Sequence, residues 1–144
     1  MTLRVLLVED DEADAYVATR KIAGDVTVVR SLREALDVSG DGYDCIALDL
    51  GLPDASGSEA LEAMLREAHC PVVVLTGQPG ATDDALRLGA QDILNKGDAS
   101  ADRLRAAIRK AVVRYESSGS QLREARLRGV ERTLNGLLGA LGHD

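Results

Sequence analysis

A regular alternation of short apolar segments with segments of helical periodicity is the strongest constraint on this chain. Most of the apolar runs are rich in Val, Ile and Leu and end at Gly, Pro or acidic residues, which is typical of buried strands. The predicted strands are residues 4–8, 26–29, 45–49, 71–75 and 91–95. The predicted helices are residues 13–23, 31–38, 57–68 and 81–88, with a fifth starting at Ser100. Such alternation predicts an α/β fold in which a doubly wound, five-stranded parallel sheet is covered by five helices.

The ends and faces of two helices are also predicted. In the helix of residues 13–23 we expect Tyr16, Val17 and Ile22 on the apolar side and Gly24 as the stop signal. In the next helix Ser31 is the expected N-cap, with Glu34 completing a capping box.

Composition and charge exclude several classes of protein. The chain has 144 residues and a net charge of -7, and residues 1–100 contain 8 Lys and Arg against 19 Asp and Glu. An acidic surface argues against direct nucleic-acid binding. No apolar run is long enough to cross a membrane, and the N-terminus lacks the layout of a secretory signal. Since Cys45 and Cys70 lack metal-ligand spacing, we expect a cytoplasmic protein with two structural thiols.

Asp49 ends one of the apolar strands and is followed by a segment too rich in Gly and Pro to continue it. A carboxylate at this position does not serve the core, because burying an unpaired charge is costly. In parallel sheets the carboxyl ends of the strands lie along one edge, where ligands bind. Polar side chains follow three other predicted strands at comparable positions, namely Glu9, Asp10, Thr76 and Lys96. We therefore expect these groups to converge with Asp49.

The converging groups match one kind of chemistry. Three carboxylates at one edge repel one another and have raised pKa values unless a cation intervenes. Mg²⁺ suits such a site, because it binds one or two carboxylates together with waters and phosphate oxygens. A hydroxyl from Thr76 and an ammonium from Lys96 would bind the remaining oxygens of a phosphoryl group. The set predicts transfer of a phosphoryl group onto Asp49.

Four motifs, in order along the chain, resemble those of a response-regulator receiver domain. They are Val5–Asp10, Leu48–Asp54 with Gly57, Val74–Gly77, and Gly89–Asp92 with Lys96. The resemblance covers about residues 3–116 and implies a flavodoxin-like strand order of 2-1-3-4-5. Residues 1–116 are accordingly predicted to be the receiver domain.

The resemblance also implies a role for each site residue. Asp49 would accept the phosphoryl group from a phosphohistidine of a sensor histidine kinase. Asp10, Asp49 and the backbone carbonyl of Gly51 would hold Mg²⁺, with Glu9 acting through a water. Thr76 and Lys96 would bind the phosphoryl oxygens. Such a domain is a signalling switch with at most weak autophosphatase activity rather than an enzyme.

Two positions depart from the family pattern. Ile93 stands three residues before the lysine, where the family usually has an aromatic switch residue, and Gly97 stands where it usually has proline. An aromatic ring that turns inward with Thr76 is therefore unavailable, so we expect phosphorylation to be kept while its usual readout is altered.

Two other functions compete with this interpretation. A phosphatase of the haloacid dehalogenase type also uses Asp, Thr and Lys on a parallel sheet, but places its nucleophile in an Asp-x-Asp motif on the first strand, where this chain has Glu9, Asp10 and Asp11. A receiver-shaped interaction module that is never phosphorylated is the third hypothesis, and the complete acidic site argues against it.

Residues 117–144 are predicted to be a C-terminal helical extension. Apolar residues recur there at the 3, 4, 3, 4 spacing of a heptad seam, at Leu127, Val130, Leu134, Leu137 and Leu141. A seam of about two heptads is too short to be stable alone. We expect it to form a homodimer that relays the signal; the alternative is a helix that folds back on its own domain.

Overall fold

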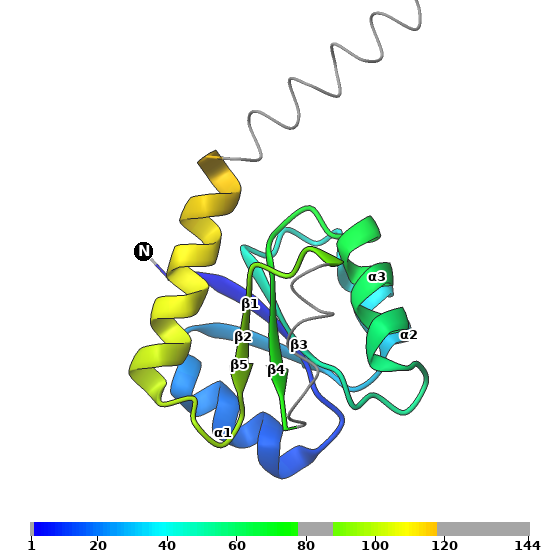
Figure 1. The fold of residues 1–144 in the computed structure, drawn as a ribbon, viewed down its shortest axis with the longest axis horizontal. Helices are drawn as coiled ribbons and strands as arrows, with labels where there is room; N and C mark the ends of the chain where they lie inside the picture. Colours follow the sequence, from blue (N-terminus) through cyan, green and yellow to red (C-terminus); the bar gives the residue numbers. More distant parts are fainter. Residues whose placement is uncertain (1, 78–87, 118–144) are drawn as a thin grey trace, which may run out of the picture. The chain divides into compact units, whose positions relative to one another are not determined.

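Five parallel strands form one sheet in the computed structural model, which describes residues 2–77 and 88–117. The strands are β1 (Arg4–Val8), β2 (Asp25–Val29), β3 (Cys45–Asp49), β4 (Val72–Thr76) and β5 (Asp92–Asn95). Their order across the sheet is β2-β1-β3-β4-β5, with every neighbouring pair parallel. The predicted fold and strand order are therefore confirmed (Figure 1).

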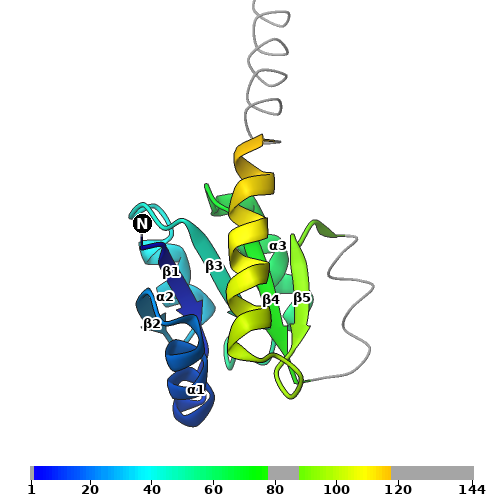
Figure 2. The same cartoon turned by 90° about the vertical axis from the view of Figure 1, so that its left-hand side faces the viewer.

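Helices cover both faces of this sheet. They are α1 (Glu12–Ile22), α2 (Leu32–Val38), α3 (Gly57–Glu67) and a last helix at residues 101–117. α1 and the first three turns of the last helix lie on one face, and α2 and α3 lie on the other (Figures 1 and 2). Within the described ranges, no helix is long and apolar enough to cross a membrane. The predicted helix 81–88, apart from Leu88, and the extension beyond residue 117 lie outside the described residues.

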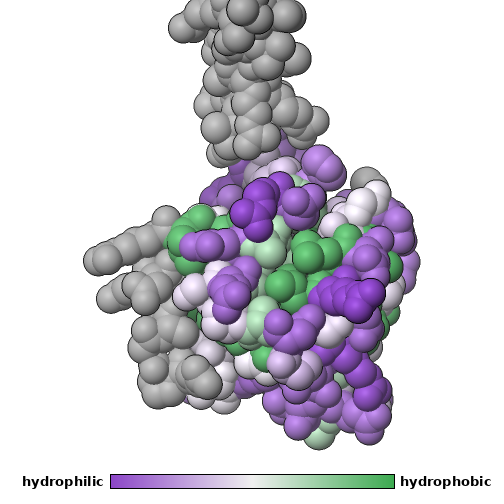
Figure 3. All heavy atoms as spheres, turned by 90° about the vertical axis from the view of Figure 1, so that its right-hand side faces the viewer, coloured by the Kyte–Doolittle hydropathy of each residue, from purple (hydrophilic) through white to green (hydrophobic). Residues whose placement is uncertain are grey.

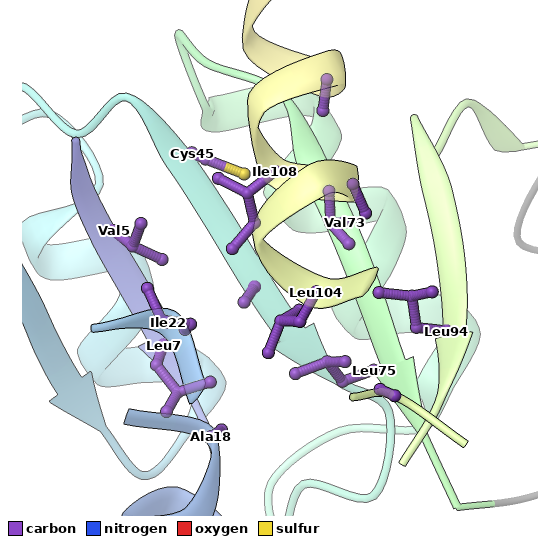
Figure 4. Packing of buried hydrophobic residues seen from close by; sticks show 14 of the residues in the cluster. Val5, Leu7, Ala18, Ile22, Cys45, Val73, Leu75, Leu94, Leu104 and Ile108 are labelled. Atoms are coloured by element: carbon purple, nitrogen blue, oxygen red, sulfur yellow. The ribbon is translucent and has the colours of Figure 1, made fainter. Parts of the chain in front are cut away.

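Alternation along the strands divides the core into two clusters. Val5 and Leu7 of β1 face α1 and the last helix, whereas Leu6 and Val8 face α2 and α3. In the first cluster, side chains of the last helix, labelled Leu104 and Ile108, lie over the strands (Figure 4). On the α2 and α3 side, a small hydrophobic area is surrounded by hydrophilic residues (Figure 3). The compact unit that contains the sheet ends at Val112.

α1 packs only partly through the face predicted: Ile22 is buried as expected, but Tyr16 and Val17 are not. Its buried residues are Ala15, Ala18 and Ile22, while Tyr16 and Val17 are 62% and 47% exposed. The buried positions are three and four residues apart, so they share one side of the helix. Tyr16 and Val17 follow Ala15 by one and two residues, which rotates them about 100° and 200° away from it. Small side chains on the buried face let the helix lie close to the sheet.

The predicted stop signal of α1 is displaced by one residue, whereas the predicted N-cap of α2 is confirmed. α1 ends in a left-handed residue, but this residue is Ala23, with φ of 54°, and not Gly24. Gly24 instead lies where a Cβ atom would be 3.2 Å from the Leu3 carbonyl oxygen. Ser31 caps α2 as predicted, by accepting a hydrogen bond from the Glu34 backbone N–H.

The predicted capping box at Ser31 is not formed. The Glu34 carboxylate accepts from the Arg30 backbone N–H rather than from that of Ser31. A complete capping box is found instead at the start of α3, between Ser56 and Glu59.

Candidate functional site

The carboxyl ends of four strands bring the predicted polar side chains to one edge of the sheet. Asp49 and Thr76 are the last residues of the neighbouring strands β3 and β4. Glu9 directly follows β1, and its backbone N–H donates to the Val29 carbonyl 2.9 Å away. Lys96 directly follows β5, and its backbone N–H donates to the Thr76 carbonyl, also at 2.9 Å. Glu9, Asp49 and Thr76 are buried at this edge.

Three of the carboxylates form a group that suits a metal ion. One oxygen each from Glu9, Asp10 and Asp49 lies within 4.8 Å of the other two. Asp10 is exposed, whereas Glu9 and Asp49 are buried, so the group opens to solvent on one side. Gly51 lies beside it, since its backbone N–H donates to Asp49 Oδ1 at 3.2 Å. Oxygen ligands with an open side are what Mg²⁺ requires, because Mg²⁺ keeps several of its waters.

Lys96 is paired with three carboxylates at once. Its Nζ lies 2.5 Å from Glu9 Oε1, 3.0 Å from Asp14 Oδ2 and 3.4 Å from Asp49 Oδ2. Asp14 is the one of these residues that sequence reasoning missed. It lies in the first turn of α1, and its place in the acidic segment directly after β1 is the signal that could have found it.

Burial and crowding of negative charge shift two pKa values at the site. Burial, followed by a hydrogen bond with Asp49, raises the pKa of Glu9 from 4.5 to about 7, although Lys96 opposes the shift. Burial alone would lower the pKa of Lys96, but hydrogen bonds with Glu9 and Asp14 outweigh it and raise this pKa. Lys96 is therefore an ammonium at neutral pH. One ammonium does not balance the carboxylates, and the remaining negative charge favours a divalent cation.

The loop after Asp49 is held by contacts at two points. Asp54 accepts hydrogen bonds from the backbone N–H groups of Leu32 and Arg33 at the start of α2, at 2.9 and 3.0 Å. These bonds hold the pKa of Asp54 below its usual range. At Gly57 a Cβ atom would lie 3.1 Å from Leu50 Cβ, so glycine allows the close approach of α3 to the loop. The carboxylate of Asp54 thus has a structural task.

The two departures from the family pattern have clear structural places. Ile93 is half-buried and packs against the hydrophobic cluster under α2 and α3. Gly97 is exposed, and its backbone N–H donates to the Asn95 side chain at 2.8 Å. The position of the usual aromatic switch is therefore filled by an aliphatic residue that contributes to the core.

Comparison with known proteins decides the family. Residues 5–109 match the response regulator receiver domain. The chain belongs to this family. The receiver is a signalling domain of two-component systems, and the haloacid dehalogenase alternative is thereby set aside.

Individual relatives agree with this assignment. The receiver is 32% identical over 139 residues to the uncharacterized transcriptional regulatory protein YkoG of Bacillus subtilis, covering 90% of this chain and 61% of YkoG. It is 36% identical over 101 residues to the cell cycle response regulator CtrA of Brucella ovis, covering 65% of this chain and 44% of CtrA. Among solved structures, the response regulator domain of Thermotoga maritima CheB superposes with a TM-score of 0.67 at 27% identity, covering 78% of this chain and 97% of that domain. The chain thus spans less than two thirds of the curated relatives it matches.

Proposed function

We propose that this receiver accepts a phosphoryl group on Asp49 from the phosphohistidine of a sensor histidine kinase, with Mg²⁺ held by Glu9, Asp10, Asp49 and the Gly51 carbonyl. The observation that carries the proposal is the convergence of Asp49, its neighbouring carboxylates and the Lys96 ammonium at one edge of the sheet. These groups lie at the ends of three separate strands, β1, β3 and β5, and maintaining so many charges together serves no purpose in packing.

The proposed step is a displacement at phosphorus. A carboxylate oxygen of Asp49 forms a bond to phosphorus while the phosphorus–nitrogen bond of the donor breaks, and the electron pair of that bond leaves with the imidazole. Space for the incoming group supports this assignment. A Cβ atom at position 51 would lie 3.6 Å from Asp49 Oδ2, in van der Waals contact with it. Because Gly51 has no side chain, this space beside the carboxylate is left open.

The other site residues would stabilise the phosphoryl oxygens. Lys96 is the positive charge of the site, and its Nζ already lies 3.4 Å from Asp49 Oδ2. Thr76 ends the strand next to β3, which suits its hydroxyl for donating to a second oxygen. When bound, Mg²⁺ supplies charge neutralisation at the remaining oxygens.

The signal would then pass to a partner. With the aliphatic Ile93 half-buried where the family usually has an aromatic ring, we propose that the readout uses the C-terminal helical extension and a homodimer formed through it, rather than an aromatic switch. A cytoplasmic location and the lack of direct nucleic-acid contacts belong to the same proposal. The domain itself would act as a phosphoacceptor and not as an enzyme with turnover on external substrates.

The test is labelling with acetyl phosphate and Mg²⁺, followed by mass spectrometry. We expect one phosphoryl group on the unaltered chain, stable in acid and sensitive to hydroxylamine, and none on the Asp49→Asn variant. Asp37→Asn, which changes an exposed carboxylate of α2, is the matched control and should be labelled normally. Equal labelling of the Asp49→Asn variant would contradict the proposal, and no labelling of the unaltered chain would favour an unphosphorylated interaction module.

A further inference from the structure

We propose that Asp14 competes with the phosphoryl group for the Lys96 ammonium, and so disfavours the phosphorylated state of this particular receiver. The inference rests on the proposed function and assigns a regulatory role to a residue outside the predicted site. Its starting point is a count of donors. An ammonium has three N–H groups, and the three carboxylates of Glu9, Asp14 and Asp49 match them in number.

Asp14 differs from the other two partners of Lys96 in position and burial. The side chains of Glu9 and Asp49 are 3% and 9% exposed, whereas that of Asp14 is 50% exposed. Asp14 lies on α1 and is not one of the three carboxylates grouped for a metal ion. Within residues 2–77 and 88–117, the side-chain partner recorded for its carboxylate is Lys96. The contact therefore draws the ammonium toward α1 without contributing to the metal group.

The backbone on both sides of this contact is held in place, so the choice of partner falls to the side chains. The Lys96 N–H is bonded to the Thr76 carbonyl, and the Asp14 N–H to the Asp11 side chain that caps α1. Lys21 of α1 also donates to the Ala99 carbonyl at 2.6 Å, which fastens the helix to the loop after Lys96. α1 and this loop are thus joined independently of the ion pair.

A small cavity lies beside the pair. It has a volume of about 80 Å³ and is lined by four charged residues, Glu9, Asp14, Lys21 and Lys96, together with apolar side chains of α1, β4, the loop after β5 and the last helix. The cavity is also open enough for water to hydrate the Asp14 carboxylate once the ammonium leaves it.

Phosphorylation increases the demand on Lys96: the N–H that now faces Asp49 can serve one phosphoryl oxygen, and any further donor must be given up by Glu9 or Asp14. It replaces the single negative charge of Asp49 with a group of charge about -2, whose oxygens need an N–H donor from Lys96. Glu9 is buried, so it cannot exchange the ammonium for solvent water. Asp14 is half-exposed and can exchange the ammonium for water at low cost. It is therefore the partner that Lys96 releases, and its remaining negative charge lies close to the new dianion.

The first experiment measures the affinity for beryllium fluoride, a phosphoryl analogue, in the presence of Mg²⁺. Because a partly exposed pair contributes little, we expect Asp14→Asn to bind the analogue about two- to fivefold more tightly. Glu12→Gln removes the same charge from the same turn of α1 at a residue whose recorded ion pair is with Arg30, and should leave the affinity unchanged. Equal affinity of the unaltered and Asp14→Asn chains would overturn the inference, and weaker binding would show that Asp14 positions Lys96 instead.

The second experiment asks whether the effect passes through Lys96. Labelling rates with acetyl phosphate are compared for Asp14→Asn, Lys96→Ala and the double variant. We expect Asp14→Asn to accelerate labelling in the unaltered chain and to have no effect once Lys96 is removed. An equal acceleration in both backgrounds would mean a general charge effect and would overturn the competition. If the unaltered chain neither binds the analogue nor becomes labelled, the proposed function fails instead, so the two failures are distinguishable.

Discussion

Glu9 gives the sharpest prediction about stability, because its carboxylate is buried among other negative charges. Its pKa of about 7 in the folded protein, against an ordinary 4.5, corresponds to about 3 kcal/mol of unfolding free energy. Below pH 4.5 the group is protonated in both states and costs nothing. Between pH 4.5 and 7 the folded protein keeps a proton that the unfolded chain has lost, so the contribution of Glu9 to stability falls as the pH rises. Above pH 7 the full cost is present.

Replacing this carboxylate with a neutral amide should therefore stabilise the metal-free protein at high pH. We expect Glu9→Gln and the unaltered chain to be about equally stable at pH 4.5, and the variant to be more stable by about 2–3 kcal/mol at pH 8. The assay is urea unfolding in EDTA, followed by circular dichroism across this pH range. Adding Mg²⁺ should reduce or reverse the difference, since the cation binds the unaltered site better.

The control is Glu12→Gln, because the side chain of Glu12 is 77% exposed and has no comparable burial. Its stability difference from the unaltered chain should stay small and nearly constant with pH. The reasoning would be refuted if Glu9→Gln showed the same difference at pH 4.5 and pH 8, or if it were the less stable protein at pH 8 in EDTA. Either result would mean that the Lys96 pair outweighs the burial of Glu9.

The remaining predictions concern a helix end and the C-terminal extension. Ala23→Gly should stabilise the protein by about 0.5–1 kcal/mol in the same urea assay, because glycine adopts the left-handed conformation of Ala23 without steric cost; a loss of stability would contradict this. The intact chain should sediment as a dimer, whereas a chain ending at Glu116 and a Leu134→Asp/Leu137→Asp double variant should both be monomers. A monomeric intact chain, or a dimer that survives both changes, would exclude dimerisation through the extension.

Much of the fold followed from local sequence patterns. The strands were predictable because apolar runs were stopped by Gly, Pro and acidic residues, and parallel pairing followed from their alternation with helices. Once the sheet is parallel, the carboxyl ends of β1, β3, β4 and β5 must lie along one edge. That geometric necessity is why Glu9, Asp49, Thr76 and Lys96 could be assigned to one site before any contact was known.

Local patterns were insufficient where packing selects among equivalent options. α1 contains both large apolar side chains and alanines, and the periodicity alone favoured Tyr16 and Val17 as its inner face. In the structure Ala15 and Ala18 are the residues buried against the sheet, because their small side chains allow the helix to approach it closely. Likewise the left-handed residue is Ala23 rather than the glycine beside it, and Gly24 instead lies where a Cβ atom would be crowded, 3.2 Å from the Leu3 carbonyl oxygen.

The sequence by itself determined which chemical groups this receiver brings together, and the tertiary structure decided how they are paired. Lys96 was identifiable from its place after a strand, but Asp14, its partner, is 82 residues away along the chain. No local pattern relates two such positions. Their contact exists because α1 and the loop after β5 pack side by side at the carboxyl ends of the strands, where the Lys21 ammonium of α1 also donates to the Ala99 carbonyl of that loop.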